Sequence, residues 1–238
     1  MNEFRFPIRL IGAAALWCAV SAANATMTFA TVATGGNSST AAQAYQASVG
    51  GALDNFSDLT INDPTPLGTA GVLNRTAVYP GPVSYTVSTQ TNLYSVQSPV
   101  IGGPALSVEN TTDSLTFSSF GGVNPVVGIR NFGASFYLSE LTASNAVAAT
   151  NMSVKATDVN GLIQNFSFSQ GSSGGAATLF FTMASTVALQ SVEFIAPLGT
   201  SFYATIDNVV LAPVPLPAAA WLLLTGLGSL GLFKRRRG

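Results

Sequence analysis

Acidic side chains are the reactive groups that the middle of this sequence offers at suggestive spacings. Asp54 and Asp58 lie close together in the chain, and Asp207 follows near the end of the same stretch. If the first and last strands of a fold lie side by side, these carboxylates would supply the oxygen ligands that Ca²⁺ prefers. The alternative is that Asp54 caps a turn and Asp58 is solvated. We prefer this alternative, because carboxylates on a strand and its flanking loop need not converge, and we assign no metal or other cofactor.

A second acidic set, Glu109, Glu140 and Glu193, raises the question of glycoside hydrolysis. That reaction needs two carboxyl groups roughly 5–10 Å apart, one of them usually with a raised pKa. No local motif brings two of these residues together. We therefore interpret them as surface residues that keep the protein soluble, and we predict no catalytic residue and no enzyme.

Aromatic residues could supply the flat faces that sugar-binding sites place against sugar rings. The candidates are Tyr79, Tyr85, Tyr94, Phe132, Phe136, Tyr137 and Tyr203. The phenylalanines fit better in a core between two sheets, together with others of their kind: Phe132, Phe136, Phe166, Phe168, Phe180, Phe181 and Phe194. Tyrosines near the proline-rich stretch 78–82 are the more exposed candidates, so a glycan-contacting tyrosine stays open as an alternative.

The composition of residues 26–213 excludes several classes of function. Arg75, Arg130 and Lys155 are its only cations, against nine carboxylates, so it lacks the basic surface that nucleic-acid binding requires. The chain has no His, and its one cysteine, Cys18, lies before this stretch. Ser-His-Asp and Cys-His catalysis, zinc sites built from these residues, and disulfides are therefore excluded.

The elements that must position these residues are short β-strands. Apolar and β-branched residues alternate with Ser, Thr and Asn, and clusters of Gly, Pro and Asn separate the segments. The predicted strands are Phe56–Ile61, Val83–Thr89, Ser114–Ser118, Val126–Asn131, Ala134–Leu138, Met152–Thr157, Leu162–Phe168, Thr178–Met183, Ser191–Ile195 and Phe202–Leu211. A hairpin is predicted at 158–161, where Asn-Gly suits a tight turn, and a helix at Thr40–Val49. Residues 26–213 should form an all-β domain, an antiparallel two-sheet β-sandwich like a jelly roll.

The C-terminal tail, residues 214–238, has the features of a sorting and anchoring signal. Residues 218–233 are apolar and uncharged, and as a helix they would span about 24 Å, slightly less than the hydrocarbon core of a bilayer. We predict one transmembrane helix there. The basic cluster that follows would stop transfer and stay in the cytoplasm; it consists of Lys234, Arg235, Arg236 and Arg237.

The residues just before this stretch carry a resemblance. They read Val214, Pro215, Leu216, Pro217 and Ala218, and are followed by Ala-Ala-Trp-Leu-Leu-Leu. The tail resembles the PEP-CTERM sorting domain of Gram-negative bacteria, in the variant whose motif is VPLPA. The resemblance covers about a tenth of the chain. It implies recognition by an exosortase, a membrane-embedded cysteine transpeptidase, with cleavage at or near the motif, and an association with exopolysaccharide-producing, biofilm-forming bacteria. The stretch from Val154 onward also weakly resembles the sandwich domain that often precedes this tail.

The N-terminus has the organisation of a signal peptide over residues 1–25. Arg5 and Arg9 form a positive region, and an apolar stretch runs over residues 10–20. Ala23 and Ala25 form an A-x-A-like cleavage site. We expect the Sec translocon and signal peptidase to act on this segment.

Taken together, the sequence predicts an exported, non-catalytic protein. It is first an inner-membrane-anchored precursor and then resides in the cell envelope, on the outer surface or in the extracellular matrix. Its expected partners are the exosortase-like enzyme and exopolysaccharide, and no nucleic acid. The alternative from another class is a carbohydrate-binding module with selective glycan recognition.

Overall fold

The computed structural model describes residues 25–33, 38–62, 65–78, 82–98, 103–122, 128–139, 146–147, 149–170, 179–199 and 201–213. Residues 1–24 and 214–238, and with them nearly all of the signal peptide and the whole sorting tail, lie outside this part of the chain. None of the helices described there has both the length and the apolar character to cross a membrane. The predicted transmembrane helix at 218–233 falls on residues that are not described.

The described residues form fourteen strands and one helix. They are β1 (Met27–Ala33), α1 (Ser38–Val49), β2 (Ala52–Asp54), β3 (Val72–Ala77), β4 (Val83–Ser88), β5 (Leu93–Gln97), β6 (Pro104–Val108), β7 (Ser114–Gly122), β8 (Ile129–Ser139), β9 (Ala146–Val147), β10 (Ala149–Asp158), β11 (Ile163–Gln170), β12 (Leu179–Ser185), β13 (Leu189–Ile195) and β14 (Tyr203–Pro213).

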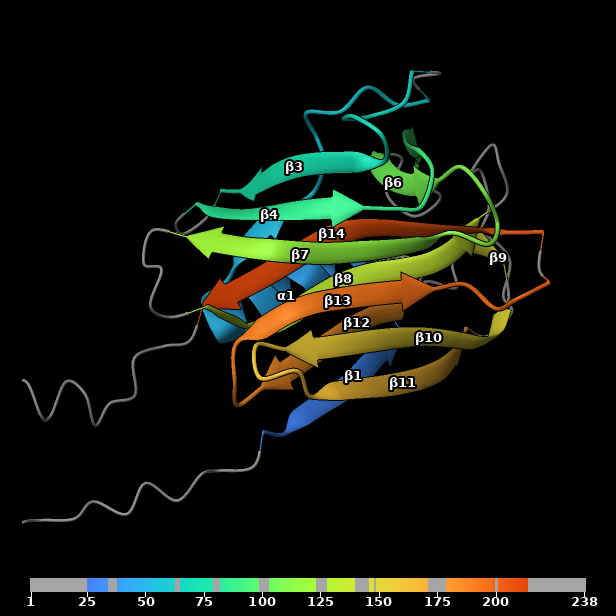
Figure 1. The fold of residues 1–238 in the computed structure, drawn as a ribbon. Helices are drawn as coiled ribbons and strands as arrows, with labels where there is room; N and C mark the ends of the chain where they lie inside the picture. The colour runs from blue at the N-terminus through green and yellow to red at the C-terminus, as the bar shows by residue number, and fades with distance from the viewer. Residues whose placement is uncertain are drawn as a thin grey trace, which may run out of the picture.

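The strands form two stacked antiparallel sheets (Figure 1). One has the order β1-β12-β8-β14-β6-β5, with β2 also paired to β14 and β9 to β8. The other has the order β11-β10-β13-β7-β4-β3. The predicted all-β, two-sheet sandwich is confirmed.

The pairing of the later strands is nested. β6 pairs with β14, β7 with β13, β8 with β12, and β10 with β11. This is the pattern of a chain folded into one long hairpin and then rolled across two sheets, as in a jelly roll. It makes β14 a central strand, held between β8 and β6.

Phenylalanine rings fill the space between the sheets. Phe194 of β13 lies with its ring centroid 4.8 Å from that of Phe136 and 5.7 Å from that of Phe132, both on β8 of the facing sheet. Phe181, as predicted from the sequence, and Phe117, which was not predicted, complete this buried group. Phe166 and Phe168 are half-buried and pack against its edge. One assignment was wrong, because Phe180 belongs to a separate cluster on the outer face of its sheet.

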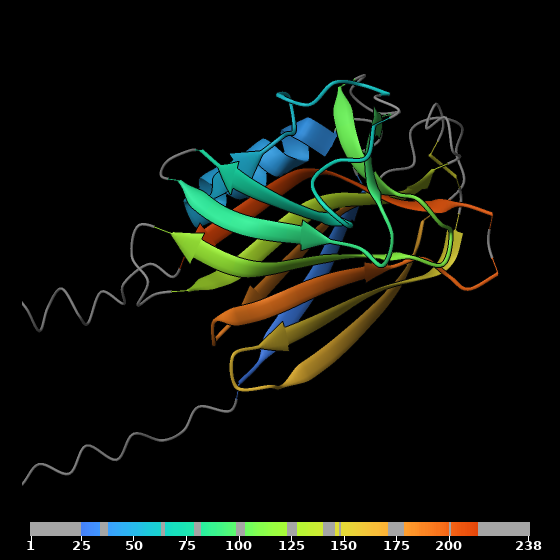
Figure 2. The ribbon, with the colours of Figure 1, turned by 45° about the horizontal axis from the view of Figure 1, so that its top comes forward.

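Helix α1 covers that outer face, behind β14 and β8 (Figure 2). Ala42 of the helix packs with Phe180 and Val210. The Tyr45 hydroxyl donates a hydrogen bond of 3.0 Å to the carbonyl oxygen of Met183. The predicted helix is therefore present, and this apolar contact explains it better than its alanine content, since short helices are stabilised mainly by packing.

Gly133 lets the helix approach β8 closely. A Cβ atom at this position would lie 2.6 Å from a ring carbon of Tyr45 and 2.9 Å from one of Phe180. We expect Gly133→Ala to lower the free energy of unfolding by about 1–3 kcal/mol in urea denaturation, because overpacking forces the rings to shift. In a Tyr45→Ala background, Gly133→Ala should lower the free energy of unfolding by less, because the ring that it would clash with is gone. An equal loss in both backgrounds would contradict the proposed clash.

The sequence misjudged several elements. Phe56–Ile61, predicted as a strand, is a turn, because the Asp54 carboxylate accepts the backbone N–H of Phe56 at 2.9 Å and Phe56 has a φ of 55°. The two strands predicted within 126–138 are one strand, β8. The predicted hairpin at 158–161 is confirmed, and the Asp158 carboxylate accepts the N–H groups of Asn160 and Leu162, both at 2.9 Å. The strands β1, β2, β3, β5, β6 and β9 were not predicted.

Candidate functional site

The densest group of charged side chains surrounds Arg75 on β3. Its guanidinium donates to Asp54 through Nε at 3.0 Å and Nη2 at 2.8 Å. It also donates to Asp58 through Nη1 at 2.8 Å and Nη2 at 2.7 Å. Tyr85, opposite Arg75 on β4, donates its hydroxyl to Asp54 at 2.7 Å. We call Asp54, Asp58, Arg75 and Tyr85 the Arg75 cluster.

The Arg75 cluster is built from the end of one strand and the middle of two others. Asp54 ends β2, which pairs with β14 and places Asp54 opposite Val209. The Arg75 side chain is only 9% exposed, and its guanidinium carbon lies 5.3 Å from the centre of the Phe56 ring. An arginine makes bidentate hydrogen bonds to carboxylates and stacks on an aromatic ring better than a lysine does.

Three members of the cluster have shifted pKa values. Burial opposes the charge of Arg75, but the hydrogen bonds to Asp58 and Asp54 outweigh it and raise the arginine pKa. The hydrogen bond from Arg75 lowers the pKa of Asp58. Burial, together with the charge of Asp54, raises the pKa of the Tyr85 hydroxyl well above its ordinary value. These shifts move Arg75, Asp58 and Tyr85 further from neutral pH, so the cluster is suited to holding β2 against β3 and β4 and not to proton transfer.

The calcium interpretation of Asp54, Asp58 and Asp207 is not supported by this arrangement. The strand that ends at Asp54, β2, does lie beside the last strand, β14, although the first strand, β1, pairs with β12 instead. However, Asp54 and Asp58 both bind the guanidinium of Arg75, which takes the place that a cation would need. In the part of the chain that the structure describes, no three His, Cys, Asp or Glu side chains gather closely enough to hold a metal ion.

Asp207 lies in a different setting, fully buried in the centre of β14. Its Oδ1 accepts the backbone N–H of Asn208 at 2.7 Å, at a β-bulge where Asn208 has a φ of 52°. Burial raises the pKa of Asp207 to about 7, although the hydrogen bonds from Asn208 and Ser98 pull it down. Burial, followed by the charge of Asp207, also raises the pKa of the nearby Tyr137 hydroxyl.

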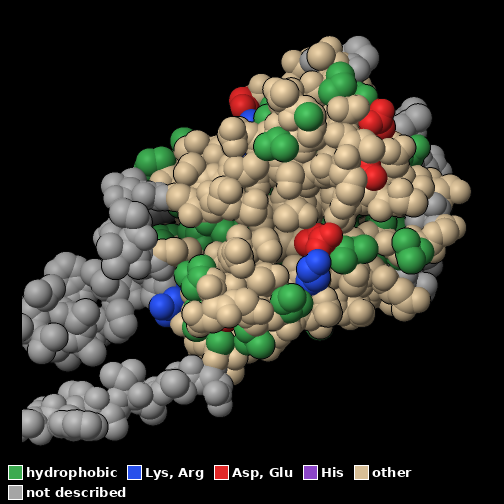
Figure 3. Space-filling model, viewed as in Figure 1, with side chains coloured by type: hydrophobic (Ala, Val, Ile, Leu, Met, Phe, Trp, Pro, Cys, Tyr) green, Lys and Arg blue, Asp and Glu red, His purple; other side chains and the backbone are tan. Residues whose placement is uncertain are grey.

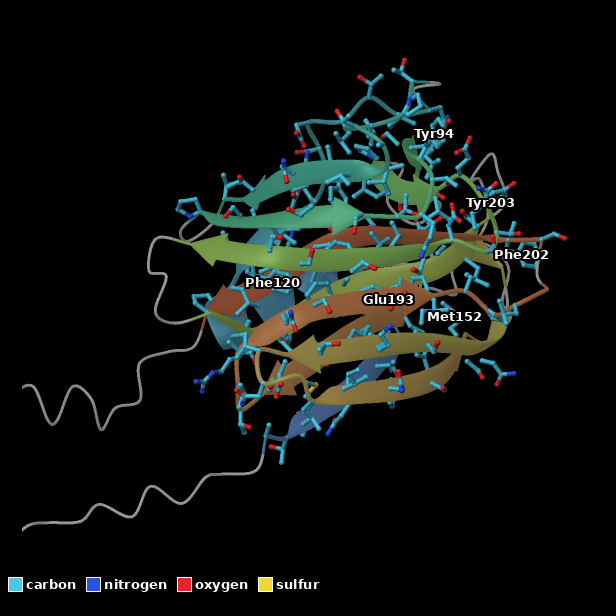
Figure 4. The ribbon with its side chains drawn as sticks, in the orientation of Figure 1. Tyr94, Phe120, Met152, Glu193, Phe202 and Tyr203 are labelled. Atoms are coloured by element: carbon cyan, nitrogen blue, oxygen red, sulfur yellow. The ribbon has the colours of Figure 1, made fainter. Side chains whose placement is uncertain are left out.

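The three glutamates do not form a catalytic pair among the described residues. Glu193, at the centre of β13 in Figure 4, binds Lys155 at 2.6 Å and accepts the hydroxyl of Ser114 at 2.8 Å. Burial alone would raise the pKa of Glu193, but Lys155 and Ser114 together hold it below its ordinary value. Glu109 follows β6 in the other sheet and accepts a hydrogen bond from Asn92 at 2.8 Å. Glu140 lies outside the described residues.

The aromatic candidates for sugar contact are divided by burial. Tyr85 is 1% exposed and bound to Asp54, and Tyr137 is fully buried, so the sequence-based suggestion that Tyr85 contacts a glycan is wrong. Phe132 and Phe136 belong to the core. Tyr94 and Tyr203 are half-buried and lie at one end of the sandwich (Figure 4). Tyr79 lies outside the described residues.

Sequence reasoning missed the role of Arg75. It counted this residue only as one of three cations. The small number of cations could have indicated this role. Residues 26–213 contain three cations and nine carboxylates, so any cation that is buried there is expected to be paired with a carboxylate.

No protein-family model matches this chain, and no curated protein matches it. Among solved structures, a glycoside hydrolase family 43 arabinoxylan arabinofuranohydrolase from Bacillus subtilis matches 65% of this chain and 29% of its own length, with 12% identity and a TM-score of 0.33. TmCBM61, solved with β-1,4-galactotriose, matches 55% of this chain and 88% of its own length, with 13% identity and a TM-score of 0.30. The enzymatically active domain of tailspike protein 4 of bacteriophage CBA120 matches 62% of this chain and 20% of its own length, with 13% identity and a TM-score of 0.26.

Proposed function

We propose that this chain is an exported, non-catalytic β-sandwich protein of the bacterial cell envelope or extracellular matrix. In this proposal an exosortase-like transpeptidase processes its C-terminal tail, and the sandwich associates with exopolysaccharide. The VPLPA motif, the apolar stretch and the basic cluster of the tail support the sorting step.

One structural observation carries the proposal furthest. The central strand β14 runs to Pro213, and Val214, the first residue of the motif, follows directly. Within the described residues, the buried or half-buried charges Arg75, Lys155 and Glu193 bind neighbouring side chains and do not converge on an open site. A sandwich whose ion pairs hold its strands together, followed at once by a sorting motif, is what a displayed structural domain requires.

Replacing Pro215 and Pro217 with Ala should block processing in the native host. We expect at least a tenfold rise in full-length precursor in the membrane fraction, because both prolines constrain the backbone that the transpeptidase must bind. Quantitative immunoblotting and mass spectrometry of the C-terminal peptide measure this. Pro213→Ala changes a proline just before the motif and should be processed normally. Normal processing of the Pro215→Ala, Pro217→Ala double variant would contradict the sorting assignment.

A further inference from the structure

Both ends of the described chain leave the sandwich at the same end. Met27 of β1 lies opposite Ser185 of β12. Asn131 of β8 lies opposite both Ala184 of β12 and Ala212 of β14. The start of β1 and the end of β14 therefore lie in one row, about 14 Å apart at three inter-strand spacings. We call this the terminal end of the sandwich, and it is on the left in Figure 1.

The connection to the predicted transmembrane helix is very short, and the predicted signal-peptide cleavage site lies next to β1. Thr26 alone separates the predicted cleavage site at Ala25 from β1. Four residues separate Pro213 from Ala218, where the predicted transmembrane helix begins. Even fully extended, a link of this length spans at most about 18 Å, and the headgroup layer itself takes up roughly 5–7 Å of that distance. The terminal end must therefore stay close to the lipid headgroups while the tail is in place.

The charges at the terminal end suit an anionic surface. Arg130 on β8 lies beside the last residues of β14, and its guanidinium makes no ion pair within the described part of the chain. Arg75 and Lys155, the other two cations of the body, are both paired. Asp158 is the one carboxylate among the described residues of this end, and it is buried as a turn cap.

Two acidic groups lie at the opposite end. Glu109 and Asp113 lie in the connection from β6 to β7, at the far end of the strands. In Figure 3 the red side chains lie at the top, at the right and over the middle of the face, away from the end where the chain leaves. An anionic bilayer attracts basic groups near its surface by about 1 kcal/mol each and repels acidic ones, so this distribution favours one orientation.

Four of the eight exposed large apolar side chains among the described residues lie at the terminal end, whereas Val32, Val72 and Leu198 lie at the other end. Val78 follows β3 and is 73% exposed, and Val159 in the β10–β11 turn is 58% exposed. Leu162 and Ile163, at the start of β11, are also exposed. Protein surfaces that rest on a lipid interface combine basic side chains with exposed apolar ones.

We propose that the terminal end is a membrane-facing surface that rests on anionic lipid headgroups in the anchored precursor. Arg130 binds lipid phosphate, Val159 and Val78 enter the interface, and the strands stand along the membrane normal. This inference rests on the proposed function, since it requires the tail to anchor the chain.

The orientation can be measured on the full chain, with Cys18→Ala removing the native thiol. The protein is reconstituted into phosphatidylcholine–phosphatidylglycerol vesicles (3:1) that carry a headgroup nitroxide, and a bimane is attached at Val159→Cys. The matched probe is Leu198→Cys, which is 87% exposed between β13 and β14 at the far end. We expect quenching at least threefold stronger at position 159, because β14 places the two ends about 35 Å apart.

Two comparisons separate the possible failures. Arg130→Gln should reduce the quenching at position 159 at least twofold, whereas Lys155→Gln removes an equal charge from a paired site and should leave it unchanged. Equal quenching at positions 159 and 198 in protein that floats with the vesicles overturns the orientation but leaves the anchor intact. Protein that does not float overturns the predicted tail anchor and, with it, this inference.

Discussion

Arg75→Met is expected to lower the free energy of unfolding by about 3–5 kcal/mol, because removing one partner of a buried ion pair leaves the other uncompensated. Asp54 is 5% exposed and would keep only the hydroxyl of Tyr85 and the N–H of Phe56 as donors. Methionine retains the apolar stem that packs on Phe56, so the lost guanidinium accounts for the effect. Urea denaturation at pH 7 measures it.

Two controls test the cause of this loss. Lys155→Met removes a cation that is 41% exposed. We expect it to lower the free energy of unfolding by less than about 1 kcal/mol, as is usual for surface ion pairs. Adding Asp54→Asn to Arg75→Met should recover part of the stability, because it removes the buried charge, while Asp58 is 67% exposed and can be solvated. If the double variant is no more stable than the single one, the loss comes from packing instead.

The fold was predictable where the pattern was local. The β10–β11 hairpin was found because Asn160-Gly161 marks a tight turn between two alternating segments. β4, β7, β13 and β14 were found for similar reasons. β5 and β6 were missed because they hold few β-branched residues. β5 pairs with β6, and β6 pairs with β14. These pairings bury the two strands, and they cannot be recognised from the sequence of one strand alone.

The Arg75 cluster could not be predicted because it joins residues by long-range pairing. Asp54 and Tyr85 are 31 residues apart in the chain, and their contact depends on β2 lying beside β14 while β3 pairs with β4. The turn at Phe56 was misjudged for a local reason, since the side chain of Asp54 competes with strand formation by binding the N–H of Phe56. The burial of Asp207 was likewise invisible, because polar neighbours such as Asn208 suggest an exposed segment.

Asp207→Asn is expected to stabilise the protein at pH 8 by up to about 4 kcal/mol, at 1.36 kcal/mol per unit of pKa difference. The ordinary pKa of an aspartate is 3.8, and burial raises that of Asp207 to about 7. The unfolded chain therefore releases this proton at lower pH than the folded chain does. The contribution of Asp207 to stability is fully present below pH 3.8, is lost as pH rises from there to about 7, and remains lost above it.

The pH dependence distinguishes this cause from a change in packing. The amide keeps an oxygen that can accept the N–H of Asn208 but cannot ionise, so the variant should gain over the wild type only as pH rises through that window. Glu193→Gln is the matched control of opposite sign: its pKa is lowered in the folded state, so the native carboxylate stabilises above its ordinary pKa and the variant should lose stability there. Urea denaturation of the three proteins at pH 4, 6 and 8 provides the comparison. If Asp207→Asn raises the free energy of unfolding equally at all three pH values, ionisation of the buried carboxyl group is not the cause. The gain would then come from a change in packing around the bulge at Asn208.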